Sequence, residues 1–369
     1  MHNMDKLFEA VARRGPVCVG LDTETAQIPP GELRRAESEA HAILAFNRAL
    51  IDAVADTAAC FKVQIAFYEA LGLAGLDAYA KTLRLIRGRG GLVIADIKRG
   101  DIAGTAAHYA RAHFSGDFEA DFVTLSPYMG MDTLEPWLAR AEQNGKGAFV
   151  LMRTSNPGMA DFQNLIIEEG GDPRGNPETA GSSSGDPPPA PRLSRRQAGQ
   201  DASAPPPPGG SAPKPPRRRR LWETVGDRLA HLASMDAYAG SSGYGAFGAV
   251  AGAPAAVSAA GREEAAAIRR AYPGLFFLIP GYGAQGGGPE DAAMLLREGN
   301  GGVVNASRSI LNAWKTKAAA LGMPPEEARD GFAAEAAREA AAGMAAALRA
   351  AAGRAVDDRA VDDRASVQP

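Results

Sequence analysis

Long hydrophobic runs are missing from this sequence. No apolar stretch in its 369 residues approaches the roughly 20 residues that a helix needs to cross a bilayer, and the opening MHNMDKLFEA lacks the apolar core of a secretory signal. A net charge of −3 gives no reason to expect binding to nucleic acid or to an anionic membrane. Cysteine is scarce, and Cys18 and Cys60 lie in or beside apolar runs, so buried reduced thiols are expected. These absences favour a cytoplasmic protein without a membrane or nucleic-acid partner.

One long segment has almost no large apolar side chains. Residues 169–220 contain 13 of the 26 prolines, and Leu193 is their only large apolar residue. Such a segment cannot bury enough surface to offset its ordering entropy, so we predict a disordered Pro/Gly/Arg-rich insert. Its closing RRRR is interpreted as a solvated charge run that leads into the next helix. A patch for nucleic acid or an acidic partner is the alternative.

The C-terminal segment is rich in alanine and has a helical pattern. It ends in a repeated AVDDR, at 355–359 and 360–364. We predict a solvent-exposed helix and a frayed tail without catalytic residues. The expected organisation is a barrel domain at 1–320, interrupted by the insert at 169–220, and a helical extension with a flexible tail at 321–369.

Elsewhere, short apolar runs alternate with helical patterns. The eight candidate strands are VCVGLD (17–22), FKVQIA (61–66), LVIAD (92–96), FVTLS (122–126), AFVLM (148–152), AFGAVAG (246–252), LFFLIP (275–280) and GVVNA (302–306). Each precedes an amphipathic or alanine-rich stretch, for example 39–58, 76–88, 131–143 and 289–298. Eight such units in about 310 residues match a (β/α)8 TIM barrel. A doubly wound open sheet is the main alternative, but no G-x-G-x-x-G follows the first strand.

Charged residues cluster at the ends of the first three candidate strands. In IADIKRGDIAGT, Asp96 and Lys98 are two positions apart and should point the same way, with Asp101 in the loop beyond. Asp22 ends the first strand, and Lys62 lies within the second, where an unpaired lysine is costly. Because catalytic residues of a barrel gather at this end, we expect a preorganised array of mixed sign. A surface ion-pair cluster with Asp101 as the next helix's N-cap is the alternative, which leaves Asp96 and Lys98 unexplained.

The loops after the seventh and eighth candidate strands have the composition of an anion site. IPGYGAQGGG (279–288) has glycines that let backbone N–H groups approach a ligand, and NASRSI (305–310) begins a helix. Loops at these positions form the usual phosphate site of (β/α)8 barrels. Arg308 would add a fixed positive charge.

Several motifs, in sequence order, resemble those of the orotidine 5'-phosphate decarboxylase family. DIKRGDI resembles its D-x-K-x-x-D-I signature, and VGLD, FKVQIAFYE, MRTSNPG, IPGYGAQGG and NASRS resemble its other characteristic blocks. ADIKRGDI together with TSNPG is similar to the bacterial branch. The resemblance covers residues 5–315 apart from the insert. It implies a barrel that converts orotidine 5'-phosphate to UMP and CO2, the last step of de novo pyrimidine synthesis, without a cofactor.

The resemblance also implies roles for individual residues. Lys98 would protonate C6 of the pyrimidine after CO2 leaves, and Asp96 would lie against the substrate carboxylate and hold Lys98. Asp101, Ile102 and Thr105 would reach into the active site of a partner subunit, which implies a homodimer. The residues expected to bind the rest of the substrate are Asp22 and Lys62 for the ribose, Ser155 for the pyrimidine, and Pro280, Gly281, Gln285 and Arg308 for the phosphate end.

These residue types suit the chemistry. Loss of CO2 from C6 leaves a carbanion with no adjacent electron sink, which a nearby ammonium can stabilise and then protonate. Binding energy from the remote phosphate can be used to close the site. Nothing here requires a metal, and the histidines show no ligand spacing. Each is expected to be a surface or a satisfied histidine: His2, His41, His108, His113 and His231.

Two alternatives to the decarboxylase remain. A sugar-phosphate branch of the same superfamily has a similar signature, but it places a magnesium-binding glutamate on the second strand, where this sequence has Lys62. A non-catalytic homologue could serve as a scaffold through the insert. The intact residues of the charged and phosphate-binding motifs disfavour the scaffold: Asp96, Lys98, Asp101, Gln285 and Arg308.

Overall fold

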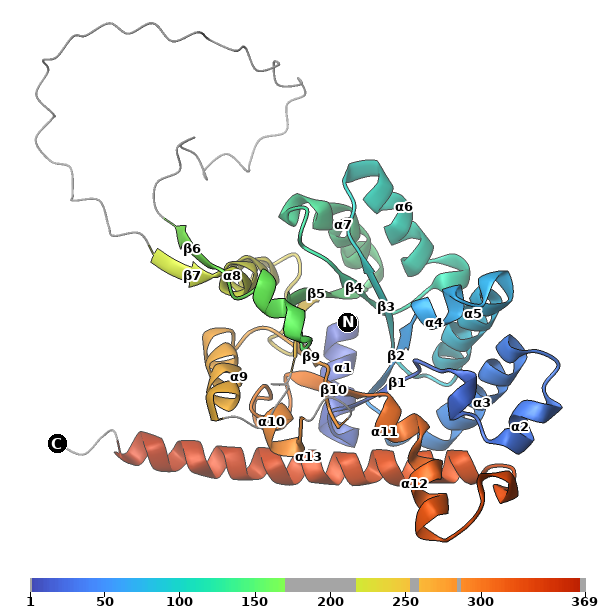
Figure 1. Ribbon diagram of the computed structural model, residues 1–369. Helices are drawn as coiled ribbons and strands as arrows, with labels where there is room; N and C mark the ends of the chain where they lie inside the picture. Colours follow the sequence, from blue (N-terminus) through green and yellow to red (C-terminus); the bar gives the residue numbers. More distant parts are fainter. Residues whose placement is uncertain (1, 170–216, 253–258, 284–286, 366–369) are drawn as a thin grey trace, which may run out of the picture.

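The computed structural model describes residues 2–169, 217–252, 259–283 and 287–365. Within them, eight parallel strands form a closed barrel surrounded by helices (Figure 1). The barrel strands are β1 (Val17–Gly20), β2 (Cys60–Gln64), β3 (Val93–Arg99), β4 (Phe122–Leu125), β5 (Gly147–Arg153), β8 (Phe247–Ala251), β9 (Phe277–Ile279) and β10 (Gly302–Ala306). Their spatial order follows the chain, and β10 pairs with β1 to close the ring. The (β/α)8 prediction is confirmed, and the open-sheet alternative is wrong.

Helices precede β1, follow β10 and occupy the intervals between successive barrel strands. They are α1 (Asn3–Arg14), α2 (Pro30–Arg35), α3 (Glu39–Val54), α4 (Ala66–Glu69), α5 (Gly72–Gly88), α6 (Ala103–Phe114), α7 (Glu135–Asn144), α8 (Leu221–Ala233), α9 (Ala259–Ala271), α10 (Pro289–Ala293), α11 (Arg308–Leu311), α12 (Ala313–Ala320) and α13 (Phe332–Ala365). The expected helix at 289–298 was too long, because α10 ends at Ala293. Among the described helices, none has the length and apolar character that crossing a membrane requires.

The helix α3 shows how the sequence builds this outer layer. The Ser38 hydroxyl caps its N-terminus by accepting a hydrogen bond from the backbone N–H of His41 at 3.2 Å. Ile43, Leu50 and Val54 recur at helical spacing and are buried. The helix therefore presents one apolar stripe to the barrel and leaves its polar face to solvent.

The helix α1, which our sequence analysis did not predict, closes the N-terminal end of the barrel. The backbone N–H of Asn3 donates to the carbonyl of Gly145, just before β5, at 2.7 Å. The Asn300 side chain, just before β10, donates to the carbonyl of Phe8 at 3.1 Å. With this end covered, the C-terminal ends of the strands remain as the open mouth.

The barrel interior between α1 and the mouth is apolar. Phe122, Phe149 and Phe276 are fully buried there, with their rings in tilted contact. Cys18 and Cys60 are buried free thiols on the neighbouring strands β1 and β2, as predicted. This packed layer separates the mouth from the opposite end of the barrel.

The ends of the predicted insert are ordered strands, which corrects its boundaries. Strand β6 (Ile166–Glu169) pairs antiparallel with β7 (Arg217–Arg220), and α8 follows at once. RRRR is therefore not only a solvated charge run: Arg219 pairs with Asp227 of α8, and Arg220 pairs with Glu264 of α9. Residues 170–216 of the predicted insert lie outside the described residues.

The predicted C-terminal helix is confirmed, but the prediction that it is solvent-exposed is wrong, because one of its faces is buried. The helix α13 runs along one side of the barrel (Figure 1) and contacts α3, α10, α11 and α12. Ala337, Ala341, Ala345 and Leu348 are buried at intervals of three or four residues. Small side chains let the helix axes approach closely, so an alanine-rich stripe forms an interface although its hydrophobicity is low. The repeated AVDDR lies within the bounds of α13 and not in a frayed tail.

Two of the five histidines are neither exposed nor fully hydrogen-bonded: His2, which is partly buried with no partner for Nδ1 among the described residues, and His113. His113 of α6 is buried, stacks on Phe118, and its Nδ1 has no partner among the described residues. Burial, with the charge of Arg99, lowers the pKa of His113 to about 4. Below the ordinary pKa of about 6.5, His113 binds a proton in the unfolded chain but not in the folded protein. The unfolding free energy therefore falls as the pH drops toward 4.

We therefore expect His113→Gln to flatten the pH dependence of unfolding. Between about pH 6.5 and pH 4, the wild type should lose up to about 3 kcal/mol more of its unfolding free energy than the variant. Urea denaturation at several pH values measures this difference. The control His41→Gln, at an exposed position, should retain the wild-type slope. Equal slopes in His113→Gln and the wild type would contradict the assignment.

Candidate functional site

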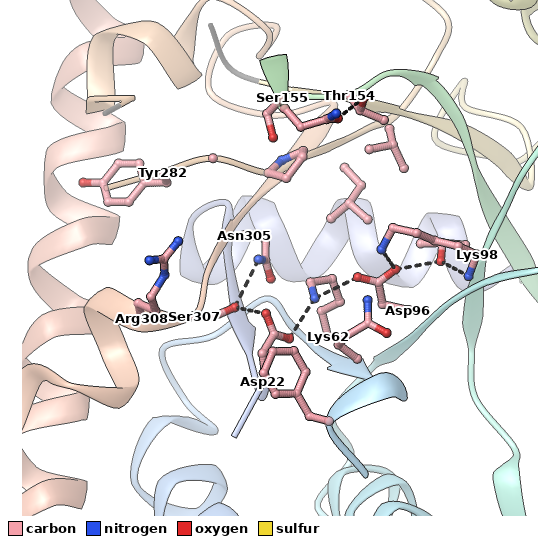
Figure 2. A pocket seen from close by; sticks show the side chains of 18 of the residues that line it. Asp22, Lys62, Asp96, Lys98, Thr154, Ser155, Tyr282, Asn305, Ser307 and Arg308 are labelled. Carbon is pink, nitrogen blue, oxygen red and sulfur yellow. Dashed lines mark hydrogen bonds and ion pairs between the residues drawn. The ribbon is translucent and has the colours of Figure 1, made fainter. Parts of the chain in front are cut away.

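A cavity of about 580 Å³ opens at the C-terminal end of the barrel (Figure 2). All eight strands contribute to its wall through residues at or just after their ends. The polar and charged lining residues are Asp22, Glu24, Gln27, Lys62, Gln64, Asp96, Lys98, Thr124, Thr154, Ser155, Asn156, Tyr282, Asn305, Ser307 and Arg308, and the others are Phe67, Leu151, Val250, Leu278, Pro280 and Gly281. The structure thus brings eight predicted site residues to one cavity: Asp22, Lys62, Asp96, Lys98, Ser155, Pro280, Gly281 and Arg308.

Four charged side chains of alternating sign form a connected array in this cavity. Lys62 Nζ lies 3.0 Å from Asp22 Oδ1 and 3.0 Å from Asp96 Oδ2. Lys98 Nζ lies 2.6 Å from Asp96 Oδ1. We call Asp22, Lys62, Asp96 and Lys98 the charged array. Among the described residues, no group of three or more His, Cys, Asp or Glu side chains is arranged to hold a metal ion.

The centre of the charged array is buried and stays ionised. Burial alone would lower the pKa of Lys62, but the Asp96 and Asp22 carboxylates outweigh it and raise that pKa well above its ordinary value. Burial alone would raise the pKa of Asp96, but Lys62 and Lys98 hold it far below its usual range. Both groups therefore carry fixed charge across the physiological pH range without needing solvent to stabilise them.

The contact between Lys98 and Asp96 depends on an irregular backbone near the end of β3 and not on the regular alternation of a strand. The pairing of β3 with β4 shifts register between Ala95 and Arg99, and Lys98 has a φ of 44°, in the left-handed region. Thr124 of β4 holds this turn, since its hydroxyl oxygen accepts from the backbone N–H groups of Ile97 and Lys98, each at 3.0 Å. The same hydroxyl donates to Asp96 Oδ1 at 2.8 Å.

This geometry makes the two lysines of the array unlike each other. The Lys98 side chain is 48% exposed, whereas that of Lys62 is 7% exposed. Lys98 therefore presents its ammonium to the cavity, while Lys62 is enclosed between two carboxylates. Of the two, Lys98 is the ammonium that a ligand can approach.

Strand β10 and the residue that follows it anchor the other end of the charged array. Ser307 donates to Asp22 Oδ2 at 2.8 Å, and Asn305 donates to Ser307 Oγ at 3.4 Å. Gly20 makes room for this contact, because a Cβ at that position would lie 1.9 Å from Ser307 Oγ. The glycine of VGLD is therefore required by packing.

The predicted anion site is partly described. Arg308 at the start of α11 lines the cavity and forms no ion pair with another described residue, and Figure 2 shows it on the side away from Lys98. Gly281 follows β9 with a φ of 99°, a conformation that favours glycine. Gln285 lies outside the described residues.

The loop after β5 faces the charged array from across the cavity. Figure 2 shows Thr154 and Ser155 on the side opposite Asp22. The Thr154 hydroxyl donates to Asn156 Oδ1 at 2.7 Å, and the backbone N–H of Thr154 donates to Gln163 Oε1 at 2.8 Å. We call Thr154, Ser155 and Asn156 the Ser155 loop.

Three predicted site residues lie outside the cavity wall. Asp101, Ile102 and Thr105 are at the start of α6, and Ile102 is 55% exposed. Asp101 accepts a hydrogen bond from the backbone N–H of Ile102 at 2.8 Å. The N-cap of α6 is Ile102, without a side-chain cap, so the alternative reading of Asp101 as the N-cap is wrong.

Two hydroxyl groups that orient the charged residues were not predicted from the sequence. Thr124 and Ser307 both belong to segments singled out earlier, FVTLS and NASRS. Each follows or ends an apolar run at the same edge of the barrel as Asp96 and Asp22. That position was an available signal, but a single hydroxyl is too common at strand ends to identify alone.

The chain is similar to known proteins over most of its length. Residues 15–173 match the sequence model of the orotidine 5'-phosphate decarboxylase / HUMPS family. An orotidine 5'-phosphate decarboxylase of Clostridium perfringens (strain SM101 / Type A) is 44% identical over 311 residues, 84% of this chain and 89% of the relative. One from Clostridium kluyveri is 43% identical over 312 residues, 85% and 88%. The structure of Leishmania donovani OMP decarboxylase is similar at a TM-score of 0.57 and 28% identity, covering 87% of this chain and 95% of that one. The chain belongs to the orotidine 5'-phosphate decarboxylase family.

Proposed function

We propose that the protein converts orotidine 5'-phosphate to UMP and CO2, in the last step of pyrimidine nucleotide synthesis in the cytoplasm. The charged array carries this proposal, because it offers one exposed ammonium beside a buried carboxylate that is ionised and fully paired. Its mixed charges neutralise one another when the site is empty. Such an array is preorganised for a reaction in which charge develops on carbon.

In the proposed complex, the substrate occupies the cavity in one orientation. Arg308, with Pro280, Gly281 and Gln285, binds the phosphate, and Asp22 with Lys62 binds the ribose hydroxyls. Ser155 contacts the pyrimidine. This order leaves C6 and its carboxylate beside Asp96 and Lys98, on the side of the cavity away from Arg308.

The reaction then follows from the charges. The bond between C6 and the carboxylate carbon breaks, its electron pair stays on C6, and CO2 leaves. The Lys98 ammonium stabilises this pair and donates a proton to C6, and solvent returns a proton to the amine. The fixed negative charge of Asp96 repels the substrate carboxylate, and this repulsion is relieved when CO2 departs. No metal or organic cofactor takes part.

A homodimer completes the site. Asp101, Ile102 and Thr105 reach the ribose end of the partner subunit's cavity. This is supported by the exposure of apolar side chains on the loops after β3 and β4, where Ile102 is 55% and Tyr128 is 84% exposed. Covering these side chains is what a subunit interface at the barrel mouth would do.

Product analysis in D2O tests the function. Wild-type protein should yield UMP and CO2 in equal amounts, and the UMP should carry deuterium at C6, since the Lys98 protons exchange with solvent. Unchanged orotidine 5'-phosphate in the presence of folded protein would refute the proposal. Sugar phosphates with magnesium would then be the next substrates to test.

Replacing Arg308 should weaken substrate binding without abolishing chemistry. We expect Arg308→Ala to raise KM by about 100-fold, because two charge-assisted hydrogen bonds to the phosphate are lost. Arg308→Lys keeps the charge without the planar guanidinium, so its KM should lie between those of the wild type and Arg308→Ala. Steady-state kinetics with orotidine 5'-phosphate measures this series. An unchanged KM in Arg308→Ala would place the phosphate elsewhere.

A further inference from the structure

The last residue of β5 is a buried arginine that directly precedes the Ser155 loop. The Arg153 guanidinium donates to the carbonyls of Thr154 at 3.3 Å and Gly252 at 3.5 Å. Its Nη2 lies 2.8 Å from Oε2 of Glu264 on α9, and the Arg153 side chain is only 8% exposed. Glu264 therefore neutralises the buried charge that holds the backbone of the Ser155 loop.

The same carboxylate makes a second ion pair. Glu264 Oε1 lies 2.8 Å from Arg220 Nη1, at the end of β7, and the Arg220 side chain is 46% exposed. Glu264 thus bridges one buried arginine beneath the Ser155 loop and one exposed arginine at the base of the insert. It does not line the cavity itself.

Close packing makes Ser155 sensitive to this bridge. The backbone N–H of Gly252, just after β8, donates to the carbonyl of Arg153 at 2.7 Å. A Cβ on Gly252 would lie 2.7 Å from both the backbone nitrogen and the Cβ of Ser155. The Ser155 backbone therefore packs directly against Gly252. Because Arg153 is hydrogen-bonded to Gly252 and lies two residues before Ser155, a shift of Arg153 would move both Gly252 and Ser155.

We propose that Glu264 is a positioning residue for recognition of the pyrimidine base, acting through Arg153 on the Ser155 loop. The inference rests on the proposed function, in which Ser155 contacts the pyrimidine. Without the carboxylate, the Arg153 charge is buried and unpaired, so the guanidinium must leave its two carbonyl partners to reach solvent or another acid. The Ser155 loop is then no longer held at a fixed distance from the pyrimidine. The proposed phosphate and ribose contacts are made by other elements, so they should not change.

The test compares a ligand that has the base with one that lacks it. Inhibition constants for UMP and for ribose 5-phosphate are measured for the wild type, Glu264→Gln and Arg220→Gln, with circular dichroism and Tm as a check of folding. We expect Glu264→Gln to raise the inhibition constant of UMP by about tenfold and to leave that of ribose 5-phosphate unchanged. Arg220→Gln is the matched control, because it removes only the exposed arm of the bridge and should leave both constants unchanged.

A second variant covers the case in which Glu264→Gln does not fold. Gly252→Ala presses on Ser155 directly and should produce the same selective loss of UMP binding. Equal weakening of both ligands, or no weakening of either, would overturn the inference. Turnover of orotidine 5'-phosphate by the wild type is measured in the same experiment. Absence of turnover would refute the proposed function and the inference together. Normal turnover, with an unchanged ratio of the UMP and ribose 5-phosphate inhibition constants in both variants, would refute the inference alone.

Discussion

Lys98→Ala should reduce decarboxylation by at least about 10⁴-fold, because in the proposed mechanism one side chain supplies both the proton and the positive charge that faces the carbanion. The loss should appear in kcat, since the proposed phosphate and ribose contacts lie elsewhere in the cavity. Asp96 keeps its contacts with Lys62 at 3.0 Å and with Thr124 at 2.8 Å, so the variant does not leave that buried carboxylate unpaired. The protein should therefore fold and still bind UMP.

Two measurements distinguish a chemical role from a structural one. The decrease in orotidine 5'-phosphate absorbance gives kcat, and UMP inhibition reports whether the site is intact. Lys81→Ala is the matched control, because Lys81 forms an exposed ion pair with Asp77 on α5 and should retain wild-type turnover. Turnover by Lys98→Ala within tenfold of the wild type would exclude Lys98 as the proton donor.

Mixing two inactive variants should restore activity if the site is shared between subunits. Asp101→Ala alone should lose at least about 100-fold in turnover, through the partner's cavity. In a hybrid dimer of Asp101→Ala and Lys98→Ala subunits, one of the two sites has both residues intact. Random exchange makes half of the dimers hybrid, so about a quarter of the wild-type activity should return.

A second mixture controls for nonspecific recovery. Asp96→Asn and Lys98→Ala change the same subunit's contribution to each site, so their hybrid dimers contain no intact site and should stay inactive. Mixing is done with brief denaturation or coexpression, and turnover is measured after size-exclusion chromatography. No recovery in the Asp101→Ala mixture, despite formation of hybrid dimers, would show that Asp101 serves its own subunit.

The barrel and the charged array could be predicted because their signals are local. Each strand is a short apolar run, and parallel strands in a barrel put their C-terminal ends at one mouth. A charged residue at such an end, as with Asp22 or Lys62, can therefore be placed without knowing its partners. The pairing of Lys62 with both carboxylates follows from neutralising buried charge.

Features that depend on distant contacts could not be predicted. The turn at Lys98 depends on the Thr124 hydroxyl of the neighbouring strand, which accepts its backbone N–H. The burial of α13 depends on small side chains packing against α3, and alanine alone does not indicate which surface it covers. The ordered ends of the insert depend on pairing between residues 166–169 and 217–220, far apart in sequence.

Metal-free decarboxylation is tested most directly by turnover of orotidine 5'-phosphate by purified wild-type protein with excess EDTA present. Substrate absorbance should fall at the same rate with and without the chelator, because in the proposed mechanism the charged array alone stabilises and protonates the carbanion. Activity that disappears with EDTA and returns with a divalent metal would contradict a mechanism based on Lys98 and Asp96 alone.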